Sequence, residues 1–336
     1  MRPVRNRIGV NILTEPIFLE PVFHQKIWGG RKLETDFGYT IPDGKIGELW
    51  AISAHPNGPN VIENGPLAGL TLDQAWADHQ EYFGHQQGKV FPLLTKILDA
   101  NDSLSVQVHP DDAYAKAHER PGELGKTECW YVIEADPGSY LIYGHHAKTR
   151  EELAQMIHDG DWDHLLRKVP VKTGDFVYVP SGTIHALNKG IMVLETQQSS
   201  DTTYRLYDYD RVGADGKKRE LHLQQSIDTT TVPSQDPKLD IQTEKRGDST
   251  VTTFVTAPLS PFFSVYRIQL KGSLDFDREA PYTLVSVLAG NGTFEADGKS
   301  YPIKKGIHFI IPNQIEHWAF TGDMDIITST PGKAEE

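Results

Sequence analysis

The sequence predicts a mainly β protein with a few helical insertions, built from one β unit that is used twice. Most apolar segments are short, rich in Val, Ile, Tyr and Phe, and bounded by Gly, Pro, Asn or Asp, which is typical of strands. The stretches KTGDFVYVPSGTIHAL (172–187) and KKGIHFIIPNQIEHWAF (304–320) both carry Gly, Pro and His at relative positions 0, 6 and 11. His317 therefore corresponds to His185, 132 residues earlier, which indicates an internal repeat.

The individual elements follow from capping signals and from short apolar runs. A Thr-x-x-Gln capping box predicts a helix over 71–84, and a Thr-x-x-Glu box predicts another over 149–160. A third, short helix is expected in DDAYAKAHE (111–119). The expected strands are LSVQV (104–108), ECWYVIE (128–134), SYLIY (139–143), DFVYVP (175–180), IMVLET (191–196), FFSVYRIQL (262–270), TLVSVLAG (283–290) and IHFIIP (307–312).

The chain length of 336 residues suggests two domains. The segment 228–249 is polar, holds two prolines and separates two strand-rich regions, so we interpret it as a linker. The predicted domains are then 1–227, which carries the helical insertions and the candidate site described below, and 250–336, which holds the second copy of the β unit.

Composition excludes several classes of function. The 33 basic and 46 acidic residues give a net charge of −13 without a run of basic residues, which argues against nucleic acid and anionic membranes as partners. No apolar run approaches the roughly 18 residues that span a bilayer. The N-terminal apolar stretch is cut by Asn11 and stopped by Glu15, so no signal peptide is expected and we predict a cytoplasmic protein. Cys129 is the only cysteine, which excludes an intramolecular disulfide and a zinc site made of thiolates.

The segment LSVQVHP carries the first candidate site residues. Alternation along a strand puts Gln107 and His109 on one face and Val106 and Val108 on the other. With Glu128, which starts the next apolar run, and His185, which follows a turn, they form a nitrogen and oxygen donor set. Such a set suits a catalytic Zn, Mn, Fe or Co ion. The alternative for each histidine alone is a hydrogen-bonded core residue. Cys129 adjoins Glu128, so we expect it on the opposite face as an inert core thiol.

The order Gln-x-His-Pro … Glu … Gly-Asp-x₄-Pro-x₄-His resembles the cupin signature in the form used by type I mannose-6-phosphate isomerases, and most closely their short bacterial form. This resemblance implies a double-stranded β-helix (cupin or jelly-roll) barrel repeated twice. The supporting blocks are KIWGG (26–30), GELWAIS (47–53), FPLLTKILDANDSLSVQVHPDD (91–112), GKTECWYVI (125–133), PSGTIHAL (180–187) and LETQQSSDTTYRLYDYDR (194–211).

The resemblance also implies a reaction, the interconversion of mannose 6-phosphate and fructose 6-phosphate through a cis-enediol, with one zinc ion per chain. It places the zinc ligands on Gln107, His109, Glu128 and His185, the catalytic residues on Arg205 and Lys126, and further substrate contacts on Lys96 and Glu195. The catalytic base stays open between a water on the metal and Lys126, whose pKa neighbouring cations would lower. Thr127 stands where many relatives have proline, which leaves the rigidity of that loop open.

Four alternatives compete with this interpretation, two for single residues and two for the whole chain. Arg205 could instead form a structural salt bridge to a neighbouring aspartate, and Lys126 could be an exposed loop charge. The chain as a whole could be a double-cupin Fe(II) dioxygenase or a non-catalytic sugar-binding cupin. Lys96, Lys126 and Arg205 in an otherwise acidic chain favour a small phosphorylated sugar as the substrate. No oligomeric state follows from the sequence.

The second copy of the β unit lacks most of the ligand set. No Gln-x-His pair occurs in its first predicted strand. Upstream of the histidine turn, YVIEADPG (131–138) resembles VSVLAGNG (285–292) at an offset of 154, which puts Tyr282 where Glu128 would be. His317 alone cannot hold a metal ion, so we expect the second copy to be structural and without metal.

Overall fold

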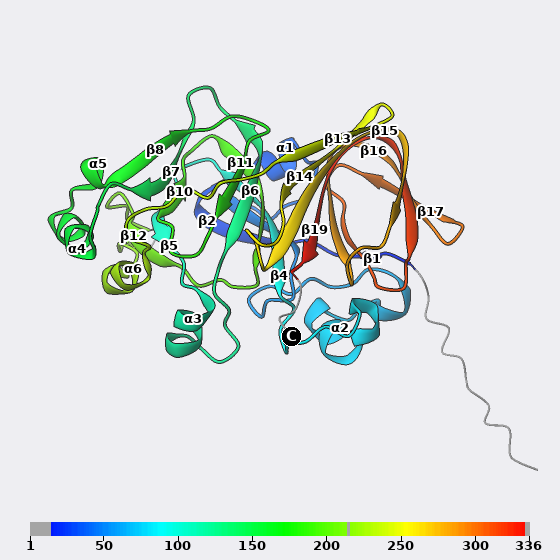
Figure 1. Cartoon of the computed structure of the whole chain (residues 1–336), viewed down its shortest axis with the longest axis horizontal. Coiled ribbons are helices and arrows are strands. Elements are labelled where there is room, and N and C mark those ends of the chain that lie inside the picture. The colour runs from blue at the N-terminus through cyan, green and yellow to red at the C-terminus, as the bar shows by residue number, and fades with distance from the viewer. Residues whose placement is uncertain (1–14, 214–215, 333–336) are drawn as a thin grey trace, which may run out of the picture.

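The computed structural model describes residues 15–213 and 216–332, and its β structure forms two bodies that lie side by side (Figure 1). The prediction of a mainly β chain with few helices is confirmed. Residues 1–14, which hold the N-terminal apolar stretch for which no signal peptide is expected, lie outside the described residues.

The first body contains two antiparallel sheets. Its six-stranded sheet has the order β2 (Val22–Gly30), β3 (Ile46–Ile52), β4 (Leu93–Ala100), β11 (Ile191–Gln198), β6 (Glu128–Ala135) and β9 (Phe176–Val179). Its five-stranded sheet has the order β12 (Tyr204–Tyr207), β5 (Val106–Val108), β10 (His185–Leu187), β7 (Tyr140–His145) and β8 (Leu166–Pro170).

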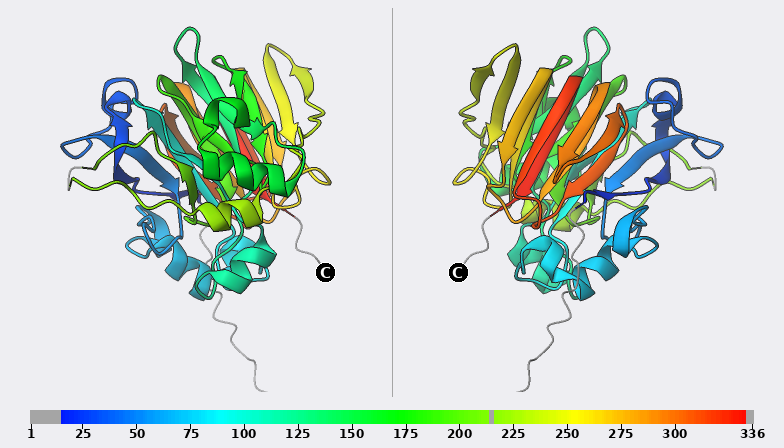
Figure 2. Two further views of the ribbon diagram at one scale, coloured as in Figure 1. Left: turned by 90° about the vertical axis from the view of Figure 1, so that its left-hand side faces the viewer. Right: turned by 90° about the vertical axis from the view of Figure 1, so that its right-hand side faces the viewer.

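The second body is one curved sheet of eight strands, in which β19 lies between β15 and β16 (Figure 2). Its order is β1 (Ile17–Phe18), β18 (His308–Ile311), β16 (Thr283–Ala296), β19 (His317–Pro331), β15 (Phe263–Asp277), β14 (Ser249–Val255) and β13 (Gln242–Arg246), with β17 (Lys299–Lys304) paired to β16. Because β1 pairs with β18, the first described strand of the chain belongs to the sheet of the second body.

The internal repeat is visible in the strand positions. β9 and β10 begin at residues 176 and 185, and β18 and β19 begin at 308 and 317, which keeps the offset of 132 found in the sequence. The glycine before each pair has a positive φ, +88° at Gly174 and +85° at Gly306. A side chain is strained in that conformation, so the turn before β9 and the turn before β18 both depend on glycine.

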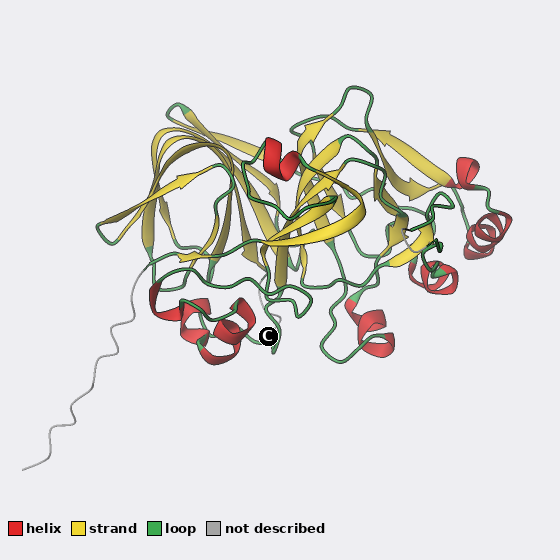
Figure 3. Cartoon of the chain, turned by 180° about the vertical axis from the view of Figure 1, so that it is seen from behind, coloured by secondary structure: helices red, strands yellow, loops and turns green. Residues whose placement is uncertain are grey.

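The helices lie at the periphery of the sheets (Figure 3). Two predicted helices are confirmed: α3 after the Asp111 cap, and α4, which begins at the Thr149 cap and ends at Gly160. Among the described residues none of the helices is long and apolar enough to cross a membrane. The helices within residues 15–213 and 216–332 are α1 (Lys32–Thr35), η1 (Gly65–Leu67), α2 (Leu72–Asp78), η2 (Gln80–Phe83), α3 (Asp112–His118), α4 (Arg150–Asp159), α5 (Trp162–Leu165) and α6 (Leu223–Thr229).

The expected helix over 71–84 is interrupted, which corrects the prediction. Its capping box forms, but α2 ends at Asp78, and the chain resumes as the 3₁₀ turn η2 after His79. The break brings the rings of Trp76 and Phe83 to a centroid distance of 5.3 Å. In a continuous α-helix, seven residues would separate them by about 10 Å along the axis. Packing of both rings into one aromatic cluster therefore favours the interruption.

The predicted linker 228–249 contains regular structure that its composition did not reveal. α6 ends inside it, and β13 forms there and pairs with β14. All five residues of β13 are exposed, because this strand lies at the edge of the sheet. A polar edge strand carries no hydrophobic alternation, so the sequence pattern alone resembles that of a linker.

One hydrophobic core joins the two bodies. It includes Leu49 and Ile97 from the six-stranded sheet and Phe263 and Leu284 from the curved sheet. Tyr282, the repeat counterpart of Glu128, lies in this core, with its ring 5.4 Å from that of Phe91.

Candidate active site and metal centre

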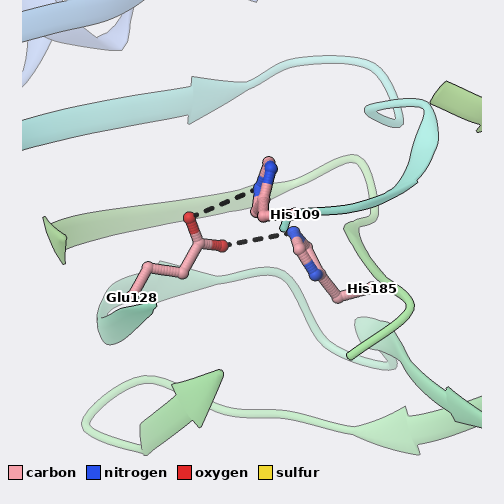
Figure 4. A group of neighbouring side chains, drawn as sticks. All are labelled: His109, Glu128 and His185. Carbon is pink, nitrogen blue, oxygen red and sulfur yellow. Dashed lines mark ion pairs between the residues drawn. The ribbon is translucent and has the colours of Figure 1, made fainter. Parts of the chain in front are cut away.

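The candidate ligands meet where β5, β6 and β10 approach one another in the first body. Glu128 and His185 are the first residues of β6 and β10, and His109 follows the end of β5. The strand register places His185 directly opposite Gln107. Ligand atoms of His109, Glu128 and His185 all lie within 4.8 Å of one another, and the three side chains point toward a common centre (Figure 4).

The two imidazole rings face the carboxylate of Glu128 with the same nitrogen. Nε2 of His185 lies 3.2 Å from Oε1, and Nε2 of His109 lies 3.6 Å from Oε2. Each Nδ1 lies 2.8 Å from a backbone carbonyl oxygen, that of Thr202 for His109 and that of Thr183 for His185. Because a carbonyl only accepts, Nδ1 carries the proton, and the lone pair of Nε2 faces the centre of the cluster, where a cation can bind it.

Burial reinforces the neutral form of both rings. It lowers the pKa of His185 to about 4. Burial, followed by the charge of Lys126, holds the pKa of His109 well below its usual value. Neutral imidazole is the form that binds metals, so both rings are in the metal-binding protonation state at neutral pH.

The carboxylate of Glu128 is fully buried, and neither of its oxygens accepts a hydrogen bond of good geometry from the described residues. A lysine is in contact with it: Nζ of Lys126 lies 2.9 Å from Oε2. The amide of Gln107 lies beside the cluster, with Nε2 3.4 Å from Nε2 of His185. Two imidazole nitrogens, a carboxylate and an amide that converge in this way fit a divalent cation such as zinc.

Lys126 is buried, and its pKa is shifted in the opposite direction from the one expected from the sequence. Its Nζ lies 3.2 Å from Nε2 of His109 and is almost completely buried, so an exposed loop charge is excluded. Burial alone would lower the pKa of Lys126, but the charges of Glu128 and Glu195 outweigh it and raise the pKa. The expectation of a lowered pKa was wrong because the groups around the ammonium are carboxylates rather than cations.

The loop that carries Lys126 is held by Thr127 despite the absence of proline. The backbone N–H of Thr127 donates to Oε1 of Gln198 at 2.9 Å, a bond that proline could not make. Its hydroxyl accepts from the backbone N–H of Ser181 at 3.2 Å. Thr127 thus ties this loop both to β11 and to the turn that precedes His185.

Lys96 and Glu195 lie opposite each other on the neighbouring strands β4 and β11. Lys96 Nζ is 3.6 Å from Glu195 Oε2 and 4.8 Å from the centre of the Trp50 ring. Burial, and then repulsion from Glu128, raise the pKa of Glu195. These contacts place a lysine and a carboxyl group beside the ligand cluster on the same sheet as Glu128.

Sequence reasoning missed Glu48, which lies 3.8 Å from Nζ of Lys96 and accepts a 2.7 Å hydrogen bond from the indole of Trp50. Burial would raise the pKa of Glu48, but Lys96 and Lys26 hold it below its usual range. Glu48 could have been found as the single carboxylate in the otherwise apolar run IGELWAI, where an acidic residue needs a cationic partner.

Arg205 lies on β12 directly opposite Gln107. Its Nε donates to Oγ of Ser105 at 3.3 Å, and its Nη1 donates to the carbonyl of Glu220 at 2.8 Å. Arg205 forms no salt bridge with a carboxylate in the part of the chain that the structure describes. The carboxylate of the nearby Asp208 is instead taken by Arg211 and Arg219. The guanidinium of Arg205 thus keeps its charge available to an anion.

The remaining sequence candidates lie away from the cluster. Cys129 is buried in the core shared by the two bodies, on the opposite face from Glu128, and burial raises the pKa of its thiol well above its usual value. The side chain of His317 is 78% exposed and pairs with Asp277 at 2.6 Å, whereas that of His185 is 1% exposed. The repeat therefore preserves the positions of the two strands but not the environment of the histidine that begins the second strand.

Known proteins resemble this chain along most of its length. The model of the phosphomannose isomerase type I catalytic domain matches residues 17–148, and that of the mannose-6-phosphate isomerase cupin domain matches residues 250–331. The mannose-6-phosphate isomerase of Streptococcus mutans is 57% identical over 317 residues, which cover 94% of this chain and 98% of the relative. The chain belongs to the type I phosphomannose isomerase family.

Other members of the family extend this relationship to solved structures. Mannose-6-phosphate isomerase ManA of Bacillus subtilis is 51% identical over 94% of this chain and 99% of its own length. A crystal structure of mannose 6-phosphate isomerase from Bacillus subtilis superposes with a TM-score of 0.90 at 49% identity and covers 94% of this chain and 99% of that one. Phosphomannose isomerase from Salmonella typhimurium shares the fold, with a TM-score of 0.76 at 15% identity, 94% coverage of this chain and 99% of that one. The fold is thus the cupin fold of this family.

Proposed function

We propose that this chain is a zinc-dependent aldose–ketose isomerase that interconverts mannose 6-phosphate and fructose 6-phosphate. One observation carries the proposal: His109, Glu128 and His185 converge in a buried cluster, in a chain 57% identical to a protein named mannose-6-phosphate isomerase. The buried, poorly partnered carboxylate of Glu128 supports a cation at the centre of this cluster.

We assign one zinc ion per chain to Gln107, His109, Glu128 and His185. When bound, zinc supplies a Lewis acid that stabilises negative charge on a substrate oxygen during the transfer of a proton between C2 and C1. The two backbone carbonyls at Thr202 and Thr183 keep the imidazoles in the tautomer that such binding needs.

Arg205 is the proposed anchor for the phosphate. A phosphate monoester is an anion of charge near −2, and a guanidinium recognises it through two parallel hydrogen bonds. Arg205 lies opposite Gln107 on the neighbouring strand, and it has no carboxylate partner among the described residues. It can therefore bind the phosphate while the sugar reaches the cluster.

Lys126 is the proposed catalytic cation beside the reacting oxygens. Its Nζ lies 2.9 Å from Oε2 of Glu128 and 3.2 Å from Nε2 of His109, so this atom can donate a hydrogen bond and a positive charge to an oxygen that becomes an enediolate. Lys96 and Glu195 are proposed substrate contacts, because they supply a donor and an acceptor for sugar hydroxyls next to the cluster.

The charge of the substrate also bears on its location. A phosphorylated sugar does not cross a bilayer unaided, because burying its charge in hydrocarbon is prohibitive. We therefore propose that the reaction takes place in the cytoplasm.

A coupled assay for fructose 6-phosphate, run with and without a chelator and alongside metal analysis, tests the proposal. We expect isomerisation that is lost on chelation and restored by zinc, with one zinc bound per chain. Oxygen-dependent turnover would instead support the Fe(II) dioxygenase alternative, for which the two histidines and one carboxylate also suffice. Binding of the sugar without turnover would support a non-catalytic cupin.

A further inference from the structure

The tautomer of His109 depends on a backbone carbonyl in the short segment 199–203, which connects β11 to β12. His109 Nδ1 lies 2.8 Å from the carbonyl oxygen of Thr202. That contact turns Nε2 toward Glu128 and Lys126. A shift of this carbonyl would rotate the ring or move its proton to Nε2, so whatever holds Thr202 also controls a metal ligand.

The carbonyl of Thr202 is held through a serine hydroxyl. The backbone N–H of Thr202 donates to Oγ of Ser200 at 3.3 Å, and that hydroxyl donates to Oε1 of Glu123 at 2.7 Å. The backbone N–H of Asp201 donates to the same oxygen at 3.2 Å. Glu123 therefore accepts hydrogen bonds directly from Ser200 and Asp201. It is linked to Thr202 indirectly, because the Ser200 hydroxyl that donates to Glu123 also accepts from the N–H of Thr202.

Glu123 is itself fixed in place. Its side chain is 5% exposed, and its other oxygen accepts a 2.9 Å hydrogen bond from Nε of Arg120. Burial would raise the pKa of Glu123, but hydrogen bonds from its neighbours lower it, so the group is a carboxylate at neutral pH. Glu123 lies in the loop that leads to Lys126 and Glu128. It therefore connects the loop before the ligand Glu128 to the segment that orients the ligand His109.

We propose that Glu123 is a positioning residue for the metal site, which holds His109 in its ligand geometry through the Ser200 hydroxyl and the Thr202 carbonyl. This inference rests on the proposed function, because it assumes that His109 is a zinc ligand. Glu123 does not touch the reacting atoms in this arrangement, and its effect passes through hydrogen bonds alone.

Two substitutions separate this role from simple stability. Ser200→Ala removes the hydroxyl that links the two segments, and Glu123→Gln keeps the size of the side chain but not its charge. Ser286→Ala is the matched control, because Ser286 is also buried and its hydroxyl bonds a histidine, Nδ1 of His308 at 2.9 Å, in the second body.

Each protein is measured in two ways: the zinc dissociation constant by competition with a chromophoric chelator, and the imidazole tautomer of His109 by ¹⁵N NMR of the metal-free protein. We expect both substitutions to weaken zinc binding by about 10–100-fold and to reduce the Nδ1-protonated form of His109. The control should change neither.

Wild-type zinc affinity together with an unchanged His109 tautomer in Ser200→Ala would overturn the proposal. The tautomer measurement needs no metal, so it still decides the role of Glu123 if the wild-type protein binds no zinc. A wild-type protein that binds no zinc would contradict the proposed function rather than the role of Glu123.

Discussion

Arg205 lies directly opposite Gln107 in the register between β12 and β5, so a guanidinium and a candidate metal ligand come from adjacent positions of one sheet. Directly opposite residues in an antiparallel pair share a face. Arg205 therefore projects on the same side as the ligand cluster, although 98 residues separate it from Gln107 in the sequence.

This relationship predicts the effect of Arg205→Ala. We expect kcat/KM for mannose 6-phosphate to fall by at least about 10²-fold, equivalent to about 2.7 kcal/mol, because the phosphate loses its charged anchor. Zinc content should stay at one per chain. Arg246→Ala is the control, since Arg246 is an exposed residue of the second body that pairs with Glu244. A near-wild-type rate in Arg205→Ala would remove this residue from the site.

His185 is buried and its repeat counterpart His317 is exposed, so substituting them should affect the zinc content differently. His185→Ala should abolish stoichiometric zinc binding, because it removes one of the buried Nε2 atoms that face Glu128. His317→Ala should leave one zinc per chain, because His317 is exposed and contacts Asp277 rather than a ligand cluster. Elemental analysis of the purified variants measures both. Loss of zinc in His317→Ala would refute the assignment of the site to the first body.

Tyr282 offers a test of the core that joins the two bodies. Its hydroxyl is buried and has no hydrogen-bond partner among the described residues. Tyr282→Phe should therefore be neutral or should stabilise the protein by up to about 1 kcal/mol, since an unsatisfied polar group is removed. Tyr282→Ala should lower the free energy of unfolding by about 3–5 kcal/mol through the cavity it leaves. Urea denaturation measures both, and a costly Tyr282→Phe would show that the hydroxyl is satisfied.

His308 predicts a pH dependence of stability. Its ring lies between the hydroxyls of Tyr39 and Ser286, and burial lowers its pKa from 6.5 to about 3. Between these two values the unfolded chain binds the proton and the folded protein does not. The free energy of unfolding should therefore fall as the pH falls from about 6.5 toward 3.

Substitution isolates this contribution from those of the other buried histidines. In His308→Gln the difference from the wild type should shrink as the pH is lowered, by up to a few kcal/mol over that range. Urea denaturation at pH 7.5, 6 and 5 measures the difference. A difference that does not depend on pH would show that His308 titrates alike in the folded and unfolded states.

Several features of the site follow from sequence spacing alone. The Gln-x-His pair could be recognised because alternation along a strand is a local property, and the Gly, Pro and His spacing marked both the turn before His185 and its copy before His317. The placement of Cys129 behind Glu128 followed from the same alternation. Neighbouring residues on a strand face opposite ways wherever the strand lies.

Other features needed the distances between strands that are remote in the chain. The pKa of Lys126 was expected to be lowered, but Glu195 on β11 and Glu128 on β6 raise it, and sequence spacing does not place their charges. Glu48 and the bonds of Glu123 were likewise invisible, since each depends on segments brought together by sheet register. The edge strand β13 was missed because it buries no hydrophobic face.

By itself the sequence determined the β character, the repeat, the donor types of the candidate site and the family resemblance, because these depend on residue identity and local spacing. Only the tertiary structure decided which charges surround Lys126, which carbonyls orient the two imidazoles, and that the two bodies share one core. Electrostatic and hydrogen-bond energies depend on distances of a few ångströms, and only the folded chain sets those distances.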